Sequence, residues 1–262
     1  MTTPEEEQVM INELLNVLRI SEQWMAAKTT TVENSSSLAG DDAKTEPYQL
    51  SHGVAQSITN AIDHLHCFRM ALTGTGDNIL RLHTYAPFTL LRGAIENAAI
   101  AVWILSPSSR DDRIIRYLRH ELTSAKKLKK ILKVAGDPVA PGTHERENEL
   151  LAIADARSID RSKITDEVTA TEIVKSASET TGFKDDEMDL VLVFWKLCSG
   201  IAHGDRGYLH LFEQEVVGQI RPGVSSVVIT APTNYVLSGS RGAVALIGAA
   251  LRLVEQRSAS HL

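Results

Sequence analysis

The chain has 262 residues, of which 43% are hydrophobic and 23% are charged. This composition is typical of a globular protein whose core is large enough to need neither metals nor disulfides. The formal net charge of −6 argues against a protein that coats nucleic acid non-specifically, because such binding depends on an excess of Lys and Arg, but it leaves room for a local basic groove.

Several features favour a cytoplasmic protein. The two cysteines, Cys67 and Cys198, lie far apart in apolar helical patterns and suggest small core residues in a reducing compartment. Residues 1–8 are acidic and lack the basic start and the apolar run of a secretory signal. The most apolar long stretch, Leu90 to Leu105, contains charged residues and is shorter than the ~20 residues that a bilayer span needs, so we expect no membrane partner.

Apolar spacing predicts mainly helices along the chain. The expected helices span residues 4–28, 48–72, 84–105, about 109–135, 144–157, 169–182, 186–203 and 234–256. Between the first two, residues 29–46 show no periodicity and predict a flexible loop.

The helical pattern is interrupted once. Two valine-rich runs flank Pro222-Gly223, so residues 208–230 predict a β-hairpin that begins just after His203 and is placed to cover it. The expected fold is therefore mainly α: a single helical domain over residues 1–262, formed by a bundle of seven or eight helices with one small β-hairpin insertion.

Two predicted helices, over residues 84–105 and 186–203, are apolar on nearly every side, so we expect them to be central and to pack side by side. Arg92 and Glu96 lie four residues apart on the first helix and share one face. Because a buried charge without a partner costs several kcal/mol, both must be paired if both are buried. Two interpretations stay open: a structural ion pair, or the charged wall of a site.

The second of these helices ends with a histidine on a polar stripe. At about 100° per residue, Asp189, Lys196 and His203 fall within roughly 40° of one another, and Ser199 lies on an adjoining line. A helix C-terminus favours a protonated imidazole, which suits a proton donor. The alternative is a core or capping histidine that bonds a carbonyl group.

We expect the two polar stripes to meet. Burying either stripe against Leu and Val would leave charges unpaired, because desolvation penalises a lone carboxylate. Glu96 should therefore lie in reach of Arg92 and of His203 or Lys196.

The helix predicted at 109–135 carries the strongest charge contrast. From Arg110 to Lys133 there are nine basic and three acidic residues, which leaves a charge of −12 on the rest of the chain. Such a run is usually a solvated face, and the sharper interpretation is a surface that contacts RNA phosphates. The candidate nucleic-acid-binding residues are Arg113, Arg116, Arg119, Lys126, Lys127 and Lys130.

Other motifs for chemistry are missing from the sequence. It has no Cys or His set with zinc spacing, no glycine-rich phosphate loop and no Gly-x-Ser-x-Gly motif. We therefore expect neither a metal nor a cofactor.

Two short motifs carry a resemblance: Leu91-Arg-Gly-Ala-Ile-Glu-Asn-Ala98 and Leu197-Cys-Ser-Gly-Ile-Ala-His-Gly204. Together they resemble a group of uncharacterised bacterial helical proteins that pair an Arg-x-x-x-Glu helix with a later Ser-x-x-x-His-Gly helix, over roughly residues 84–206. That group is distantly similar to HEPN proteins (higher eukaryotes and prokaryotes nucleotide-binding). The resemblance implies a helical fold and a homodimer, and many HEPN domains are metal-independent ribonucleases of toxin or phage-defence systems.

The HEPN signature is an arginine, then four to six residues, then a histidine. His203 matches the histidine, but Lys196 stands in the place of the arginine. Lys lacks the planar fork that binds phosphate through two hydrogen bonds, so this difference puts catalysis in question more than fold. Arg113 and His120 also fit the spacing, on the charged helix.

Two functions follow as hypotheses. In a HEPN-like endoribonuclease, His203 would act as general acid or base, Lys196 or Arg92 would stabilise the charge on phosphorus, and Glu96 would orient one of them. Ser199, one turn before His203, completes the candidate catalytic set. In the alternative, a non-catalytic partner-binding or effector protein, the same polar stripes would form a buried network that fixes how the helices pack.

Overall fold

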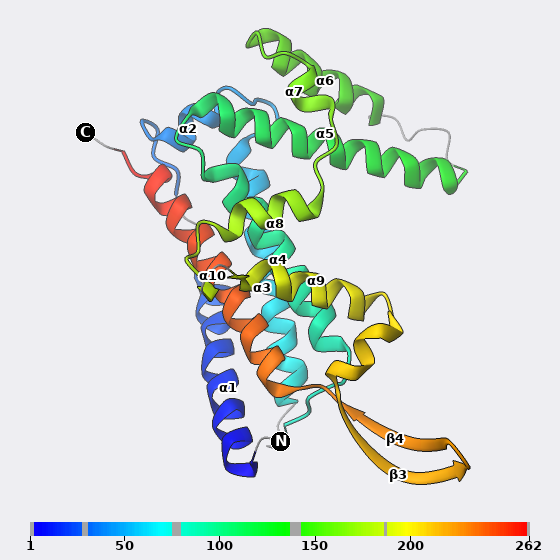
Figure 1. Ribbon diagram of the computed structural model, residues 1–262. Helices are drawn as coiled ribbons and strands as arrows, with labels where there is room; N and C mark the ends of the chain where they lie inside the picture. The colour runs from blue at the N-terminus through cyan, green and yellow to red at the C-terminus, as the bar shows by residue number, and fades with distance from the viewer. Residues whose placement is uncertain (1–2, 28–30, 75–79, 137–142, 186–187, 261–262) are drawn as a thin grey trace.

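The computed structural model describes residues 3–27, 31–74, 80–136, 143–185 and 188–260 (Figure 1). Within these ranges the predicted fold class is confirmed, because ten α-helices and one 3₁₀ helix accompany two small antiparallel sheets. The α-helices are α1 (Pro4–Ala26), α2 (Ser37–Asp42), α3 (Leu50–Thr73), α4 (Ala86–Leu105), α5 (Arg110–Val134), α6 (Thr143–Ala156), α7 (Ser162–Thr165), α8 (Ala170–Ser178), α9 (Leu190–Ala202) and α10 (Thr233–Ser258). The 3₁₀ helix is η1 (Arg206–Leu211), and the strands are β1 (Lys184–Asp185), β2 (Met188–Asp189), β3 (Glu213–Arg221) and β4 (Val224–Thr230).

Four long helices form a closed bundle around the core. Helix α1 packs on α3, α3 on α4, α4 on α10, and α10 back on α1 (Figure 1). Helix α4 is the most deeply buried, and its Ile95 and Ala98 are completely inaccessible. Outside this bundle α8 and α9 pack against α4, while α5 carries α6 and α7 at the other end of the molecule (Figure 1).

Helix α9 packs beside α4, as expected, but it is not central. One side of it contacts α4 and α10, where the ring of Phe194 lies so close to Gly239 that a Cβ atom there would fall 1.9 Å from a ring carbon. The opposite side faces solvent, with Val193 50% exposed and Lys196 exposed. An all-round apolar sequence therefore does not mean full burial in this helix.

Strands β3 and β4 form the predicted hairpin, with Val216 paired opposite Val227. The hairpin extends away from the helices (Figure 1), and every residue of β3 is exposed. The expectation that it covers His203 was wrong, since His203 itself is exposed. The first residues of the expected hairpin form η1 instead of strand.

The segment predicted as a loop, residues 29–46, contains helix α2 in its described part. Ser36 caps this helix by accepting a hydrogen bond from the backbone N–H of Ala39. Leu38 and Asp41 of α2 are buried. The sequence missed α2 because a helix of six residues is too short to show a period.

Helices α4 and α10 are long and apolar enough to cross a membrane, by length and composition alone. Helix α4, with 20 residues, begins before the apolar stretch that the sequence marked as too short. More than half of the most apolar part of each helix is buried inside the protein, which a core helix satisfies as well as a span does. Localisation and the absence of a membrane partner therefore stay predictions.

Candidate functional site

The two polar stripes meet at Arg92 and His203. Nη1 of Arg92, on α4, lies 3.3 Å from Nε2 of His203, the residue that ends α9. The arginine side chain is about three-quarters buried, whereas the histidine is exposed. A charged donor and an imidazole from segments 111 residues apart are thus brought together at the surface.

Glu96 holds the Arg92 side chain in this position. Its Oε1 accepts hydrogen bonds from Nε of Arg92 and from Nε1 of Trp195, both at 2.8 Å. The predicted contact of Glu96 with Arg92 is confirmed, but its partner on α9 among the described residues is Trp195 and neither His203 nor Lys196. Trp195 was not predicted; the available signal was that a buried indole N–H needs a hydrogen-bond acceptor. We call Arg92, Glu96, Trp195 and His203 the candidate site.

The other predicted residues of α9 do not join the candidate site. Asp189 caps the start of α9 through Leu192 N–H and accepts a hydrogen bond from Ser178. Lys196 is exposed, and no hydrogen bond or ion pair joins it to another described residue. Ser199 is half-buried, and its carbonyl group accepts the His203 backbone N–H at 3.1 Å. Among the predicted catalytic residues, then, Arg92, Glu96 and His203 come together.

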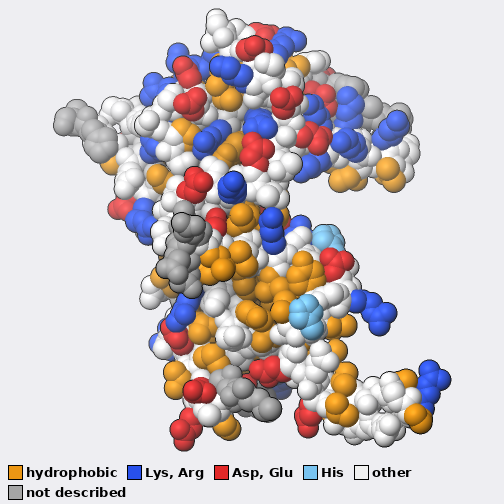
Figure 2. Space-filling model, in the orientation of Figure 1, with side chains coloured by type: hydrophobic (Ala, Val, Ile, Leu, Met, Phe, Trp, Pro, Cys, Tyr) orange, Lys and Arg blue, Asp and Glu red, His pale blue; other side chains and the backbone are white. Residues whose placement is uncertain are grey.

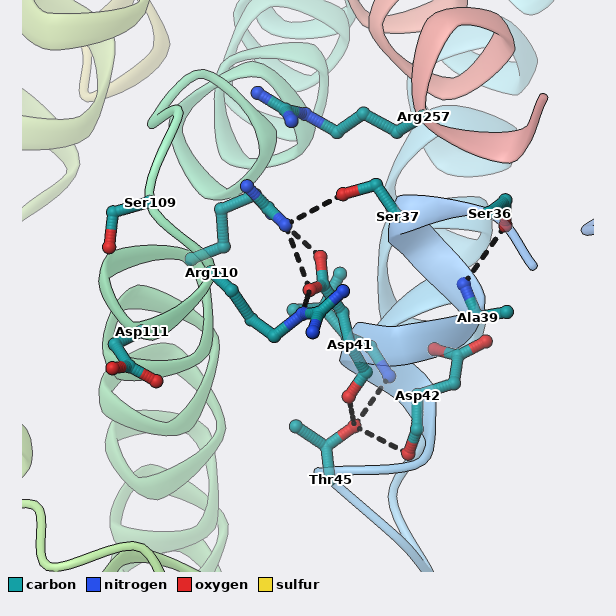
Figure 3. Close-up of polar contacts among 12 residues, drawn as sticks. Ser36, Ser37, Ala39, Asp41, Asp42, Thr45, Ser109, Arg110, Asp111 and Arg257 are labelled. Carbon is teal, nitrogen blue, oxygen red and sulfur yellow. Dashed lines mark hydrogen bonds and ion pairs between the residues drawn. The ribbon is translucent and has the colours of Figure 1, made fainter. Parts of the chain in front are cut away.

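Arg113 was predicted to contact nucleic acid, and this was wrong because only 1% of it is exposed. It pairs with the buried Asp41 of α2 through hydrogen bonds of 2.6 and 2.8 Å. Arg110, one turn earlier on α5, adds a third hydrogen bond to the same carboxylate (Figure 3). Arg113 also donates to Ser37 and to the carbonyl groups of Pro107 and Ser108. These ion pairs and hydrogen bonds hold α2 against α5.

Most of the other basic residues on α5 also have partners within the protein. Arg116 donates to the carbonyl group of Trp103 and lies over its ring, and burial lowers its pKa below the ordinary arginine value. Arg119 donates a hydrogen bond to Glu172, Lys126 to the carbonyl group of Thr165, and Lys130 to Glu167. Lys127 alone of the six is exposed without a partner among the described residues. Figure 2 shows Lys and Arg mixed with Asp and Glu over this end of the molecule, which favours a solvated face.

Two adjoining hollows lie between the candidate site and α6. The larger, of about 500 Å³, is lined by α3, α4, α5 and Arg146 of α6. The smaller, of about 140 Å³, is lined by Glu96 of the candidate site and by Lys127. The two share Ile100, His120 and Ser124 as lining residues, so they adjoin, and the smaller one reaches Glu96 of the candidate site.

The thiols lie in different surroundings. Cys198 is buried on α9, and burial raises the pKa of its thiol well above the ordinary value, so it stays protonated and is a poor nucleophile. Cys67 was expected in the core, and this was wrong because it is exposed on α3. Within the described residues no three His, Cys, Asp or Glu side chains are grouped so that they could hold a metal ion.

Comparisons with protein-family models, with curated proteins and with solved structures give no match to this chain.

Proposed function

We propose that this protein cleaves RNA without a metal ion, with His203 and Arg92 acting on the scissile phosphodiester. The contact between Arg92 Nη1 and exposed His203 Nε2 carries the proposal. A guanidinium has no acceptor atom, so a hydrogen bond in this contact requires Arg92 to donate and Nε2 to accept. The exposed imidazole and the arginine beside it are the two groups that phosphodiester cleavage needs, a proton carrier and a positive charge.

The chemistry requires a proton carrier and a positive charge at the phosphate. Once the substrate has bound and the Nη1 donor of Arg92 has turned from Nε2 to a phosphoryl oxygen, the 2′-oxygen of a ribose attacks the adjacent phosphorus as its proton passes to the freed Nε2 of His203. The bond from phosphorus to the 5′-oxygen then breaks, and that oxygen takes the proton back from His203. A 2′,3′-cyclic phosphate and a 5′-hydroxyl result, with Arg92 stabilising the charge that builds up on the phosphoryl oxygens.

Glu96 and Trp195 act as positioning residues. Glu96 engages Nε of Arg92, which leaves the Nη groups directed to His203 and available to a phosphate. Since Trp195 donates to the same carboxylate oxygen, the orientation of the arginine depends on both helices. Preorganised charge of this kind stabilises a transition state without rearrangement during the reaction.

The pairing of Arg92 with His203 can be compared with the HEPN signature. The signature places the arginine shortly before the histidine in the chain, and here Lys196 occupies that arginine position. Arg92 of α4 lies beside His203 instead. An arginine and a histidine are therefore paired, as in the signature, although they come from distant parts of the chain. This supports the ribonuclease proposal more strongly than the motif spacing does, and the toxin or phage-defence role is what the resemblance adds.

The test is cleavage of single-stranded RNA in the presence of EDTA. We expect His203→Ala to lower the rate by about 10²-fold or more, the usual contribution of a general acid–base group. Arg92→Lys should also lose activity, because Lys cannot make two parallel hydrogen bonds to a phosphate.

His210→Ala is the matched control, because His210 is exposed on η1, just beyond α9, and has no partner among the described residues. It should cleave at the wild-type rate, and circular dichroism should show all variants folded. Equal activity of His203→Ala and the wild type, or no cleavage by the wild type, would refute the proposal.

The hairpin favours a second candidate, a non-catalytic partner-binding protein. Six of its valine and isoleucine side chains are exposed: Val216, Val217, Ile220, Val224, Val227 and Val228. Exposed apolar groups gathered in this way mark interaction surfaces. A second copy of this chain is the partner that the resemblance to dimeric HEPN domains suggests.

A further inference from the structure

We propose that the larger hollow, between α3, α4 and α5, binds a nucleobase. Its volume of about 500 Å³ falls within the range of small-molecule sites. Three carboxamide side chains line it: Gln56 and Asn60 from α3 and Asn97 from α4. The proposal does not depend on RNA cleavage, because a nucleobase could bind here whether or not His203 is catalytic.

The carboxamides have unused hydrogen-bonding capacity. Gln56 and Asn60 make no side-chain hydrogen bond to another described residue, and both are exposed residues that line the hollow. Asn97 donates one N–H to the carbonyl group of Gly93, so its side-chain oxygen stays available as an acceptor. A carboxamide presents a donor and an acceptor side by side, as the edge of a nucleobase does, and the two can pair through two hydrogen bonds.

Apolar side chains supply surfaces for the flat faces of a ring. Ile100 and Ile104 are one turn apart on α4 and so share a face, and Leu128 of α5 lines the same hollow. Polar edges combined with apolar walls suit a planar heterocycle better than a sugar, whose hydroxyl groups point in all directions.

The charge of the hollow favours a neutral ligand. Arg146 enters it from α6 but pairs with Glu121. Burial alone would raise the pKa of Glu121, but its contacts with His120 and Arg146 lower it below its ordinary value. The carboxylate therefore stays ionised and offsets the charge of Arg146, so this pair exerts little net attraction on an anion.

A phosphate attached to the base would meet a positive charge in the smaller hollow. His120 and Ser124 lie between the two hollows, and the smaller one contains Lys127, which has no partner among the described residues. The smaller hollow also contains Glu96 of the candidate site. The base could accordingly belong to a free nucleotide or to an RNA strand whose backbone continues toward His203.

The experiment titrates adenosine, guanosine, cytidine and uridine into the wild type and its variants by calorimetry. We expect saturable binding of at least one nucleoside, and binding at least tenfold weaker in Gln56→Leu and in Asn60→Leu. Neither residue has a bond to lose within the protein, so both variants should fold. Gln23→Leu, an exposed carboxamide on α1 away from the hollow, should bind like the wild type.

A second arm identifies the source of the base. If the hollow takes a base of RNA, a short single-stranded oligoribonucleotide should displace the bound nucleoside, and an abasic strand of equal length should not. If it takes a free nucleotide, the 5′-monophosphate should bind more tightly than the nucleoside, and the oligoribonucleotide should not compete. Absence of nucleoside binding, or equal binding by Gln56→Leu, Asn60→Leu and the wild type, would overturn the proposal.

Discussion

Asp41 is the residue on which the α2–α5 contact depends. Its carboxylate is completely buried and accepts hydrogen bonds from Arg110 and Arg113, the second of which is buried as well (Figure 3). Taking two charges out of water costs free energy, which the pairing and the extra hydrogen bonds to Ser37 and two carbonyl groups offset. The pair is thus stable while both charges are present, but the loss of either residue leaves a buried charge unpaired.

Replacing Asp41 by Asn should lower the free energy of unfolding by about 3–5 kcal/mol, because it leaves the Arg113 guanidinium buried without a counter-charge. Urea denaturation measures this loss. Asp155→Asn is the control, since Asp155 and Arg161 form a pair on the surface and the midpoint should hardly move. A double change, Asp41→Leu with Arg113→Met, should recover much of the stability; if it is no better than the single change, the unpaired charge is not the cause.

At the scale of elements, α4 and α9 are held together by polar as well as apolar contacts. Trp195 is buried among core residues and donates to Glu96 across the helix boundary. The same carboxylate orients Arg92. The hydrogen bond from Trp195 to Glu96 therefore links the packing of α9 to the geometry of the candidate site.

Trp195→Phe should lower the free energy of unfolding by about 1.5–3 kcal/mol, the range for a hydrogen bond to a charged group. Trp24→Phe is the comparison, because the Trp24 indole on α1 is half-buried and bonds no described residue. Glu96→Gln should also be less stable than the wild type, since Arg92 loses its counter-charge. Equal urea midpoints for Trp195→Phe and Trp24→Phe would show that the bond to Glu96 contributes nothing.

The sequence predicted some elements and contacts better than others, for physical reasons. Apolar periodicity located α4 and α9, and the cost of burying lone charges predicted that their stripes meet. Periodicity does not show which charged residue of a surface helix turns inward, so the burial of Arg113 against Asp41, 72 residues earlier, was missed. It also does not show how deep a helix lies, and α9 was taken as central.

At the scale of the whole molecule, the hairpin is the part that packs least. Alternating strands usually bury one face, which is why the sequence suggested a cover over His203. In the structure every residue of β3 is exposed, and an isolated hairpin is only marginally stable in water. A partner that covers its apolar side chains would therefore stabilise the hairpin.

We expect the wild type to form a homodimer through the hairpin. Val216 and Val227 are opposite one another across the strands, so they share a face, and they are 66% and 39% exposed. Changing both to Thr keeps the branched shape that strands favour but replaces apolar methyls with hydroxyls, so the hairpin should persist while association weakens. Light scattering over a concentration series should show a dimer for the wild type and mainly monomer for Val216→Thr/Val227→Thr. Ile131→Thr/Val134→Thr, at two exposed positions on α5, should dimerise like the wild type. A monomeric wild type, or equal loss of the dimer in both double variants, would rule out the hairpin as the interface, because a specific interface must distinguish its own apolar residues from others on the surface.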